Sequence, residues 1–279
     1  MLSYLNKNIS NEFGIDTTYK IIPKSLHPYK LMTIYALDKN TNSSVFAAFI
    51  CYIYNDTESL KKIFRILNVS YEFSPISVTL DFDKAQIKAL KNCEKFDRKP
   101  YLIPCLFHYS QIIMRKLKKY KIYKKRLTKR ASEIIHNCEI LCFIKKENIG
   151  NFFNIIKNNL SNLKEEKLFI KYLGKNWIHK NKDLYNYSGL IEDILKCKNL
   201  FINKKGKENS DNILFSNIKS LNKVFFTNNI CESMHGKIAN HLPNRFISKE
   251  SFRETLNYII NNNKNKKKNL LEEIIFQEH

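Results

Sequence analysis

The sequence predicts an α/β protein, a mixed five-stranded sheet flanked by helices, with a large all-helical insertion before the last core helix. Two observations predict it. Strand patterns fill the first third of the chain and then alternate with helix patterns up to about residue 120. From about 126 to 219 the strand patterns largely disappear. We therefore expect a core of residues 1–125 and 220–260, a helical insertion of 126–219, and a basic tail with a short terminal helix at 261–279.

The chain opens with three strand patterns, at residues 13–22, 29–37 and 44–54. In the first, Phe13 and Ile15 share one face while Gly14 and Asp16 lie on the other, because side chains alternate along a strand. The other two are rich in strand-forming residues, and turn-like segments separate all three. We expect an antiparallel meander.

Helix and strand patterns then alternate, with helices at 56–67, from 83 and from 108, and strands at 76–80 and 101–107. Strands joined through helices need right-handed crossovers and a parallel part of the sheet. Three antiparallel strands followed by helix, strand, helix, strand and helix form the layout of ribonuclease H-like domains.

The charge of the chain is strongly positive. Among 279 residues, 48 Lys and Arg stand against 26 Asp and Glu, a net charge of +22, which attracts polyanions such as nucleic acid. The chain is also rich in Lys, Asn, Ile, Tyr and Phe, which AT-rich codons encode, so codon bias is an alternative source of the lysines. The Lys-rich segment 264–268 fits a nuclear-localisation signal or a solvated tail.

The densest positive charge lies in RKLKKYKIYKKRLTKR, residues 115–130, which we call the basic cluster. We expect a helix here whose apolar residues face the sheet while its cations project outward toward DNA phosphates. A solvated helix face is the alternative. The candidate DNA-binding residues are Arg115, Lys116, Lys118, Lys119, Lys124, Lys125 and Arg126.

The same sequence indicates neither a membrane protein nor a secreted one. The longest apolar run, 45–54, is about half the roughly 20 residues that a membrane span needs. The first ten residues lack the basic start and apolar stretch of a secretory leader. The seven cysteines are odd in number and scattered, so we expect reduced thiols in an intracellular protein.

Two aspartates lie close together in SVTLDFDKAQIKAL, residues 77–90, but have different expected roles. Asp81 falls at the carboxyl end of a strand, where open α/β sheets bind ligands. Asp83 precedes a helix as its N-cap, and Gln86 three residues later completes a capping-box pattern. Phe82 and Ile87 fit the accompanying hydrophobic staple. Local helix chemistry accounts for Asp83 and leaves Asp81 unexplained.

Asp81 has two candidate partners in a metal site. Asp16 lies on the polar face of the first strand, and Glu232 lies in TNNICESMHGKIANHL, where it shares a helical face with His235. Clustered carboxylates repel one another until a cation is present, and Mg²⁺ prefers such oxygen ligands. The alternatives are an edge-strand aspartate facing water and a surface glutamate on an amphipathic helix.

Four segments in order resemble blocks of Mutator-like element (MULE) transposase domains: IDTTYK (15–20), LDFDKAQIKAL (80–90), CLFHYSQIIMRK (105–116) and TNNICESMHGKI (227–238). The resemblance covers roughly residues 13–260. It implies a ribonuclease H-like DDE core that binds Mg²⁺ or Mn²⁺ and in which Asp16, Asp81 and Glu232 are the catalytic and metal-binding acids. Cys105 and His108 match the family's Cys-x-x-His motif. They supply two of the four ligands that a structural zinc site needs, so we predict no zinc.

The function that the resemblance implies is DNA transposition, with metal-dependent phosphodiester hydrolysis and strand transfer at transposon ends. DNA would be the partner, a homodimer on DNA is left open, and a eukaryotic protein of this kind would act in the nucleus. The chain departs from the family at Thr17, where glycine is usual, and no zinc-binding module is found in it. Two alternatives therefore stay open: a non-catalytic DNA-binding or regulatory protein derived from a transposase, and a nucleic-acid-processing nuclease of the same fold.

Overall fold

A computed structural model describes residues 9–38, 44–96, 99–160, 163–179, 187, 235–236, 238–242, 248–264 and 274–276. The chain divides into two compact units, the first made of Met1–Leu102 and Ser220–His279 and the second of Ile103–Lys219. The second unit thus starts at Ile103, earlier than the expected boundary at 126. In the part of the chain that the structure describes, every helix is too short or too polar to cross a bilayer.

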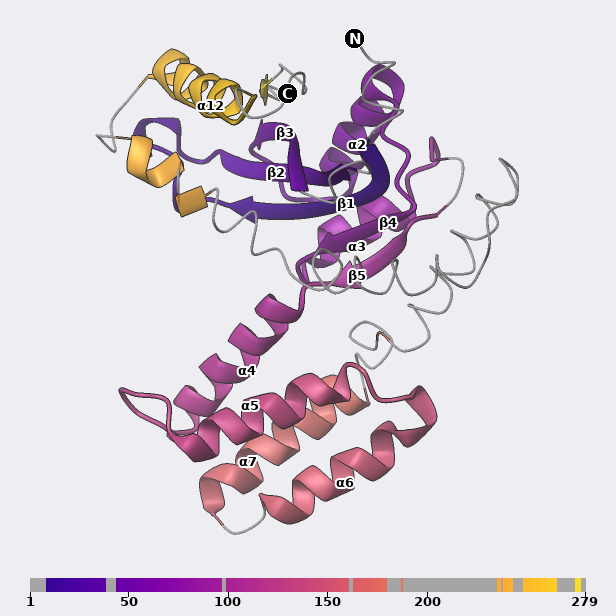
Figure 1. Cartoon of the computed structure of the whole chain (residues 1–279), viewed down its shortest axis with the longest axis vertical. Helices are drawn as coiled ribbons and strands as arrows, with labels where there is room; N and C mark the ends of the chain where they lie inside the picture. Colours follow the sequence, from indigo (N-terminus) through magenta and orange to yellow (C-terminus); the bar gives the residue numbers. More distant parts are fainter. Residues whose placement is uncertain are drawn as a thin grey trace. The chain divides into compact units, whose positions relative to one another are not determined.

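The first unit is built on a mixed sheet (Figure 1). Within the described residues it has six strands in the order β5-β4-β1-β2-β3-β6. The strands are β1 Ile9–Thr18, β2 Lys30–Asp38, β3 Ser44–Tyr52, β4 Ser77–Leu80, β5 Tyr101–Pro104 and β6 Ile274–Phe276. Strands β1, β2 and β3 pair antiparallel, and β1 pairs parallel with β4. The expected meander and the α/β class with a mixed sheet are confirmed.

The sixth strand is a correction. We expected a short helix at the end of the chain, but β6 pairs parallel with β3 from Phe49 to Cys51. The edge of β3 offers backbone groups that need partners, and an apolar β-branched segment can supply them as a strand. The helix before it, α12, runs from Lys249 to Lys264 and so extends past residue 260, where we placed the end of the core.

Helices cover both faces of this sheet. One face packs against α2 (Thr57–Tyr71) and α3 (Lys84–Lys91) through a core that includes Ile15, Ile34 and Val78. On the opposite face, Leu31, Phe49 and Cys51 pack against Ile238 and against Phe252 and Leu256 of α12. The alternation of side chains along β1 and β2 produces this division, because neighbours in sequence point to opposite faces. A short 3-10 helix, η1 (Lys24–Leu26), follows β1.

The described residues of the second unit after β5 form helices and the turns that join them (Figure 1). Thr128 begins α5 as an N-cap, because its hydroxyl accepts a hydrogen bond from the Ala131 amide. Contacts join α4 to α5, α5 to α6, and α6 to η3. The elements are α4 Leu106–Lys119, α5 Lys129–Leu141, η2 Lys146–Asn148, α6 Ile149–Asn159, α7 Lys164–Leu173 and the π-helical η3 Gly174–Ile178.

We expected the basic cluster to form one helix, but it does not. Helix α4 ends at Lys119, and Lys121 follows with a φ of 61°. The Lys121 amide donates to the Lys118 carbonyl and the Ile122 amide to the Leu117 carbonyl, at 3.0 Å each. These two bonds form a Schellman motif, which closes the helix end. A Schellman motif usually has glycine at its left-handed position. Because lysine is there instead, the sequence did not indicate that the helix ends at this point.

Candidate metal site on the polar face of the sheet

Buried polar side chains gather on one face of β1, β2 and β4. Glu12 and Asp16 of β1 alternate with the apolar residues that face α2 and α3, and the β4 residues Ser77 and Thr79 do the same. The parallel register pairs Glu12 with Ser77 and Gly14 with Thr79. Burying polar groups costs free energy unless each has a hydrogen-bond partner. A buried polar face on a sheet therefore indicates a functional site rather than a hydrophobic core.

The sheet brings two of the predicted acids to corresponding positions. Asp81 directly follows Leu80, the last residue of β4. The β1–β4 pairing ends at Gly14 and Thr79, and Asp16 and Asp81 each lie two residues beyond that pair. Neighbouring strands lie about 4.8 Å apart, and paired residues point to the same face. Asp16 is 3% exposed, whereas Asp81 is half-buried. The two acids therefore lie at the edge of the buried polar face.

Asp16 also contacts a histidine from the far end of the chain. Oδ2 of Asp16 lies 3.3 Å from Nδ1 of His235, and Nε2 of the same ring lies 3.0 Å from Oγ1 of Thr33. Thr33 is the residue that pairs with Asp16 across β1 and β2. A ring protonated on Nδ1 donates to the carboxylate and accepts from the hydroxyl, so both contacts are satisfied by a neutral histidine.

The position of Asp16 excludes one of the alternatives considered for it. It lies on a strand flanked by β2 and β4 and is buried, so it is not an edge-strand aspartate facing water. His235 reaches it from the helical residues 235–236 and 238–241, which Ile238 anchors in the core. The sequence indicated His235 only as a residue that shares a helical face with Glu232.

The third predicted acid, Glu232, lies outside the described residues. It precedes His235 by three positions in the sequence. Its place in the site stays a prediction.

Asp83 has the structural role that we predicted. Its Oδ1 accepts hydrogen bonds from the amides of Ala85 and Gln86, at 2.8 and 3.0 Å, and so caps α3. Its Oδ2 accepts a third bond from the side chain of Asn55, at 2.8 Å. In the expected capping box the Gln86 side chain would bond back to the Asp83 amide. It donates instead to the Thr17 hydroxyl, at 2.7 Å.

The bond from Gln86 to Thr17 belongs to a hydrogen-bond network beside Asp16. The hydroxyl of Tyr52 donates to Asn55 Oδ1 at 2.9 Å and lies 3.4 Å from the Thr17 hydroxyl. Burial raises the pKa of Tyr52 to about 12, so the phenol remains a neutral donor at ordinary pH. Thr17, the position where the transposase family has glycine, is therefore held by two neighbours next to the candidate site.

Gly14, two residues before Asp16, lies under the ring of Tyr35. A Cβ on Gly14 would fall 1.8 Å from Tyr35 Cζ, well inside contact distance. The two residues pair across β1 and β2, so the ring crosses the strand where only glycine leaves room. The sequence pattern showed Gly14 on the polar face but did not indicate this close approach.

Cys105 and His108 lie at the start of α4, in the second unit. The strand expected over 101–107 ends at Pro104, and Cys105 becomes the buried N-cap residue of the helix without a side-chain cap bond. His108 is half-buried in the first turn. The Cys105 Sγ and a ring nitrogen of His108 lie within 4.8 Å of one another, so the Cys-x-x-His motif forms one local cluster.

The candidate DNA-binding residues lie on the surface of the second unit. Lys116 is half-buried, with Nζ 4.6 Å from the ring centroid of Tyr172 in α7, which is cation–π distance. Arg115 donates a hydrogen bond to Gln111 one turn earlier, at 2.9 Å. The exposed members of the set are Arg115, Lys118, Lys119, Lys124, Lys125 and Arg126. Their exposure fits a phosphate-binding surface and a solvated one equally.

The candidate site therefore consists of Asp16 on β1 and Asp81 directly after β4, with His235 in contact with Asp16. Comparison of the sequence with models of known protein families and with curated proteins finds no match to either.

Proposed function

We propose that the chain is the catalytic domain of a DNA transposase of the Mutator-like type, with a ribonuclease H-like core. The observation that carries the proposal is the parallel β1–β4 pairing, two residues beyond which lie the buried Asp16 and the half-buried Asp81. The order β3-β2-β1-β4-β5, with an antiparallel meander and a parallel β1–β4 pair, supports that core.

The residues present fit a divalent metal. The carboxylates of Asp16 and Asp81 would offer the hard oxygen donors that Mg²⁺ and Mn²⁺ prefer, and we assign Glu232 as the third ligand from the sequence. When bound, such ions activate a water or a 3′-hydroxyl and stabilise the leaving oxygen in phosphodiester chemistry. His235 orients Asp16 through its Nδ1, and the network of Gln86, Tyr52 and Thr17 holds the end of β1.

DNA is the proposed substrate because the chain carries a net charge of +22 and an exposed basic cluster. In a eukaryotic cell the protein would act in the nucleus, and it would work as a monomer or as a homodimer on transposon ends.

The proposal is tested by nicking of supercoiled plasmid DNA in Mn²⁺ or Mg²⁺. The wild-type protein is expected to nick, and Asp16→Ala, Asp81→Ala and Glu232→Ala are expected to abolish the activity. Asp83→Ala is the matched control, because it removes a cap that stabilises α3 by about 0.5–2 kcal/mol and leaves the metal ligands in place. Unchanged cleavage by Asp81→Ala would refute the assignment.

One contact favours the non-catalytic alternative, a DNA-binding protein derived from a transposase. Oδ2 of Asp16 is already held by His235, which competes with a cation for that oxygen. The alternative predicts salt-dependent DNA binding that is equal in EDTA and in Mn²⁺, with no nicking by any variant. The plasmid assay and a binding assay run in parallel distinguish the two functions.

A further inference from the structure

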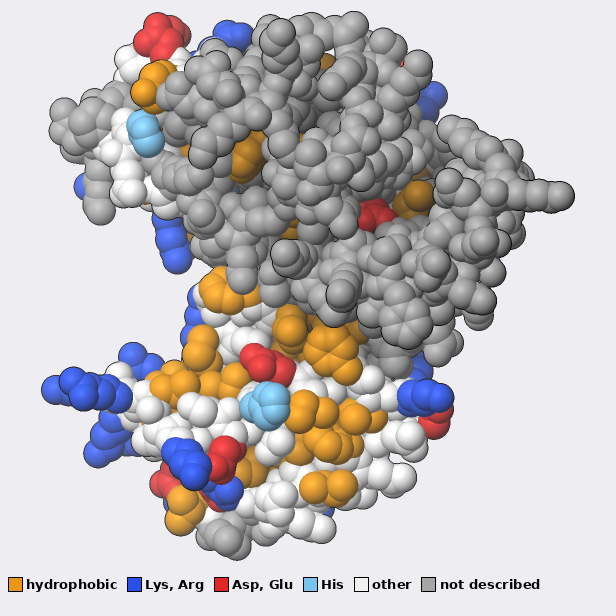
Figure 2. Space-filling model, viewed as in Figure 1, with side chains coloured by type: hydrophobic (Ala, Val, Ile, Leu, Met, Phe, Trp, Pro, Cys, Tyr) orange, Lys and Arg blue, Asp and Glu red, His pale blue; other side chains and the backbone are white. Residues whose placement is uncertain are grey.

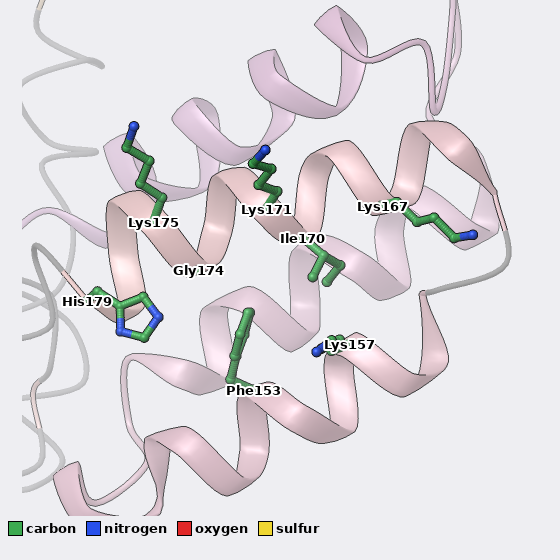
Figure 3. Close-up of a pocket in the computed structure, with 8 residues that line it drawn as sticks. All are labelled: Phe153, Lys157, Lys167, Ile170, Lys171, Gly174, Lys175 and His179. Atoms are coloured by element: carbon green, nitrogen blue, oxygen red, sulfur yellow. The ribbon is translucent and has the colours of Figure 1, made fainter.

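A groove opens between α6 and the continuous helix of α7 and η3 in the second unit, with a volume of about 540 Å³ (Figure 3). Its floor is apolar and consists of Phe153, Ile170 and Gly174. Figure 3 shows Phe153 of α6 and Ile170 of α7 pointing toward one another across it. The other lining residues, as far as the structure describes the chain, are Lys157, Lys167, Lys171, Lys175 and His179, so every charged residue in the lining is a lysine.

The lysines of the second helix follow from helical spacing. Lys167, Lys171 and Lys175 recur every four residues, which puts them on one side of the helix about 6 Å apart along its axis. In Figure 3 Lys171 and Lys175 extend in the same direction and away from Phe153, so they stand at the rim of the groove and not over its floor. All three are exposed, as is Lys157 across the groove. The groove therefore has an apolar floor between cationic edges.

A change in helix type shapes one end of the groove. At η3 the helix widens to π geometry, where the His179 amide donates to the Gly174 carbonyl at 3.1 Å. A Cβ on Gly174 would lie 3.1 Å from Phe153 Cζ, so glycine allows the ring to approach the helix closely. Short π segments recur at functional sites because they place side chains that a regular helix cannot. Here the segment puts Lys175 and His179 at the groove.

The chemistry of the lining selects a ligand with negative charge and exposed flat apolar surface. Duplex DNA offers phosphates, but its bases are stacked inside and cannot reach an apolar floor. An unpaired strand offers both, since its phosphates meet cations while its bases stack on aromatic side chains. We propose that this groove binds single-stranded nucleic acid, with phosphates at Lys167, Lys171 and Lys175 and an unpaired base against Phe153. This inference rests on the nucleic-acid substrate of the proposed function and not on its cleavage chemistry.

The surroundings of the groove favour a nucleic acid over an acidic helical peptide, which would also suit cationic edges and an apolar floor. Tyr172 of α7 lies next to Lys171 in sequence and contacts Lys116 and Tyr120 of the basic cluster. The positive surface thus continues from α7 onto α4, and Figure 2 shows Lys and Arg side chains gathered where α4 leads into α5. A polymer charged along its whole length can use both regions, whereas a short peptide fills only the groove.

The test measures fluorescence anisotropy of a labelled oligothymidine of about 15 nucleotides, and of a duplex of equal length, in EDTA. It uses the full chain carrying Asp81→Asn, so that no cleavage is required and loss of nicking does not affect the result. Phe153→Ala is expected to weaken single-strand binding about tenfold and to leave duplex binding unchanged. The double variant Lys171→Glu/Lys175→Glu is expected to weaken single-strand binding more than tenfold.

Lys146→Glu is the matched control, because Lys146 is an exposed lysine of the same unit that does not line the groove. It is expected to change single-strand affinity far less than the double variant does. Circular dichroism shows that each variant is folded. The proposal is overturned if folded Phe153→Ala and Lys171→Glu/Lys175→Glu bind the single strand as the parent chain does. It is also overturned if the lysine variant loses only the binding of a labelled acidic helical peptide.

Discussion

Nδ1 of His235 lies 3.3 Å from Oδ2 of Asp16, and both side chains are buried. The contact joins the first strand to a helical segment near the other end of the sequence. A buried carboxylate loses its hydration, and a hydrogen bond from an imidazole replaces part of it. His235 therefore both orients Asp16 and ties the two ends of the first unit together.

The first prediction concerns His235. His235→Ala is expected to lower the free energy of unfolding by about 1–3 kcal/mol, because it leaves the Asp16 carboxylate and the Thr33 hydroxyl without this partner. Urea denaturation followed by circular dichroism measures the loss. His241→Ala is the matched control, since His241 is an exposed residue of the same helical segment. Equal effects of the two substitutions would contradict a stabilising role for the contact.

The second prediction follows from the proposed metal site. In that site the carboxylates of Asp16 and Asp81 repel one another without metal, so Asp81→Asn is expected to stabilise the protein in EDTA by about 1 kcal/mol. Mn²⁺ at about a hundred times its dissociation constant is expected to stabilise the wild-type protein by about 2.7 kcal/mol and the variant far less. Thermal unfolding with and without Mn²⁺ measures both effects. If Mn²⁺ leaves the melting temperature of the wild-type protein unchanged, the metal site is ruled out.

Strand alternation and helix-capping patterns in the sequence predicted much of this site. They could not predict its contacts between residues far apart in the chain. Asp83 was identifiable as a cap from its place before a helix, and Asp81 as a strand-end acid from the alternation of Val78 and Leu80. The bond between His235 and Asp16 depends on how distant segments meet, which a single sequence does not encode in any local pattern. The same is true of the Tyr35 ring over Gly14 and of β6 at the edge of β3.

The end of α4 shows a different limit. Helix propensity continues through the basic cluster, and a stop at Lys119 requires a left-handed residue that a sequence usually announces with glycine. Lys121 takes that conformation without being glycine, so the expected helix was too long. The groove between α6 and α7 was likewise invisible, because its two sides come from separate helices.

The third prediction concerns this helix end. Lys121 holds a φ of 61°, which costs a residue with a side chain about 1 kcal/mol relative to glycine. Lys121→Gly is therefore expected to raise the free energy of unfolding by about that amount. Lys125→Gly, in the loop that follows, gives the matched control, because it removes a similar exposed charge. Chemical denaturation measures both, and a lower stability of Lys121→Gly than of the wild type would contradict the Schellman assignment.

The fourth prediction uses the buried thiols. Burial raises the pKa of Cys51 to about 12, and it raises the pKa values of Cys138 and Cys142 as well. Each thiol stays protonated in the folded protein at a pH where it ionises in the unfolded chain. The stabilisation is complete below the ordinary thiol pKa of about 8.5, and it is lost as the pH rises toward the folded value.

Two measurements check this. The free energy of unfolding is expected to fall above about pH 9, by up to about 1.4 kcal/mol per pH unit for each such thiol. At pH 8, alkylation by iodoacetamide followed by mass spectrometry is expected to label the half-buried Cys93 well before these three, because a thiolate must form and be reached. Rapid labelling of Cys138 in the folded protein would contradict its burial between α5 and its neighbours, since that thiol is 0% exposed.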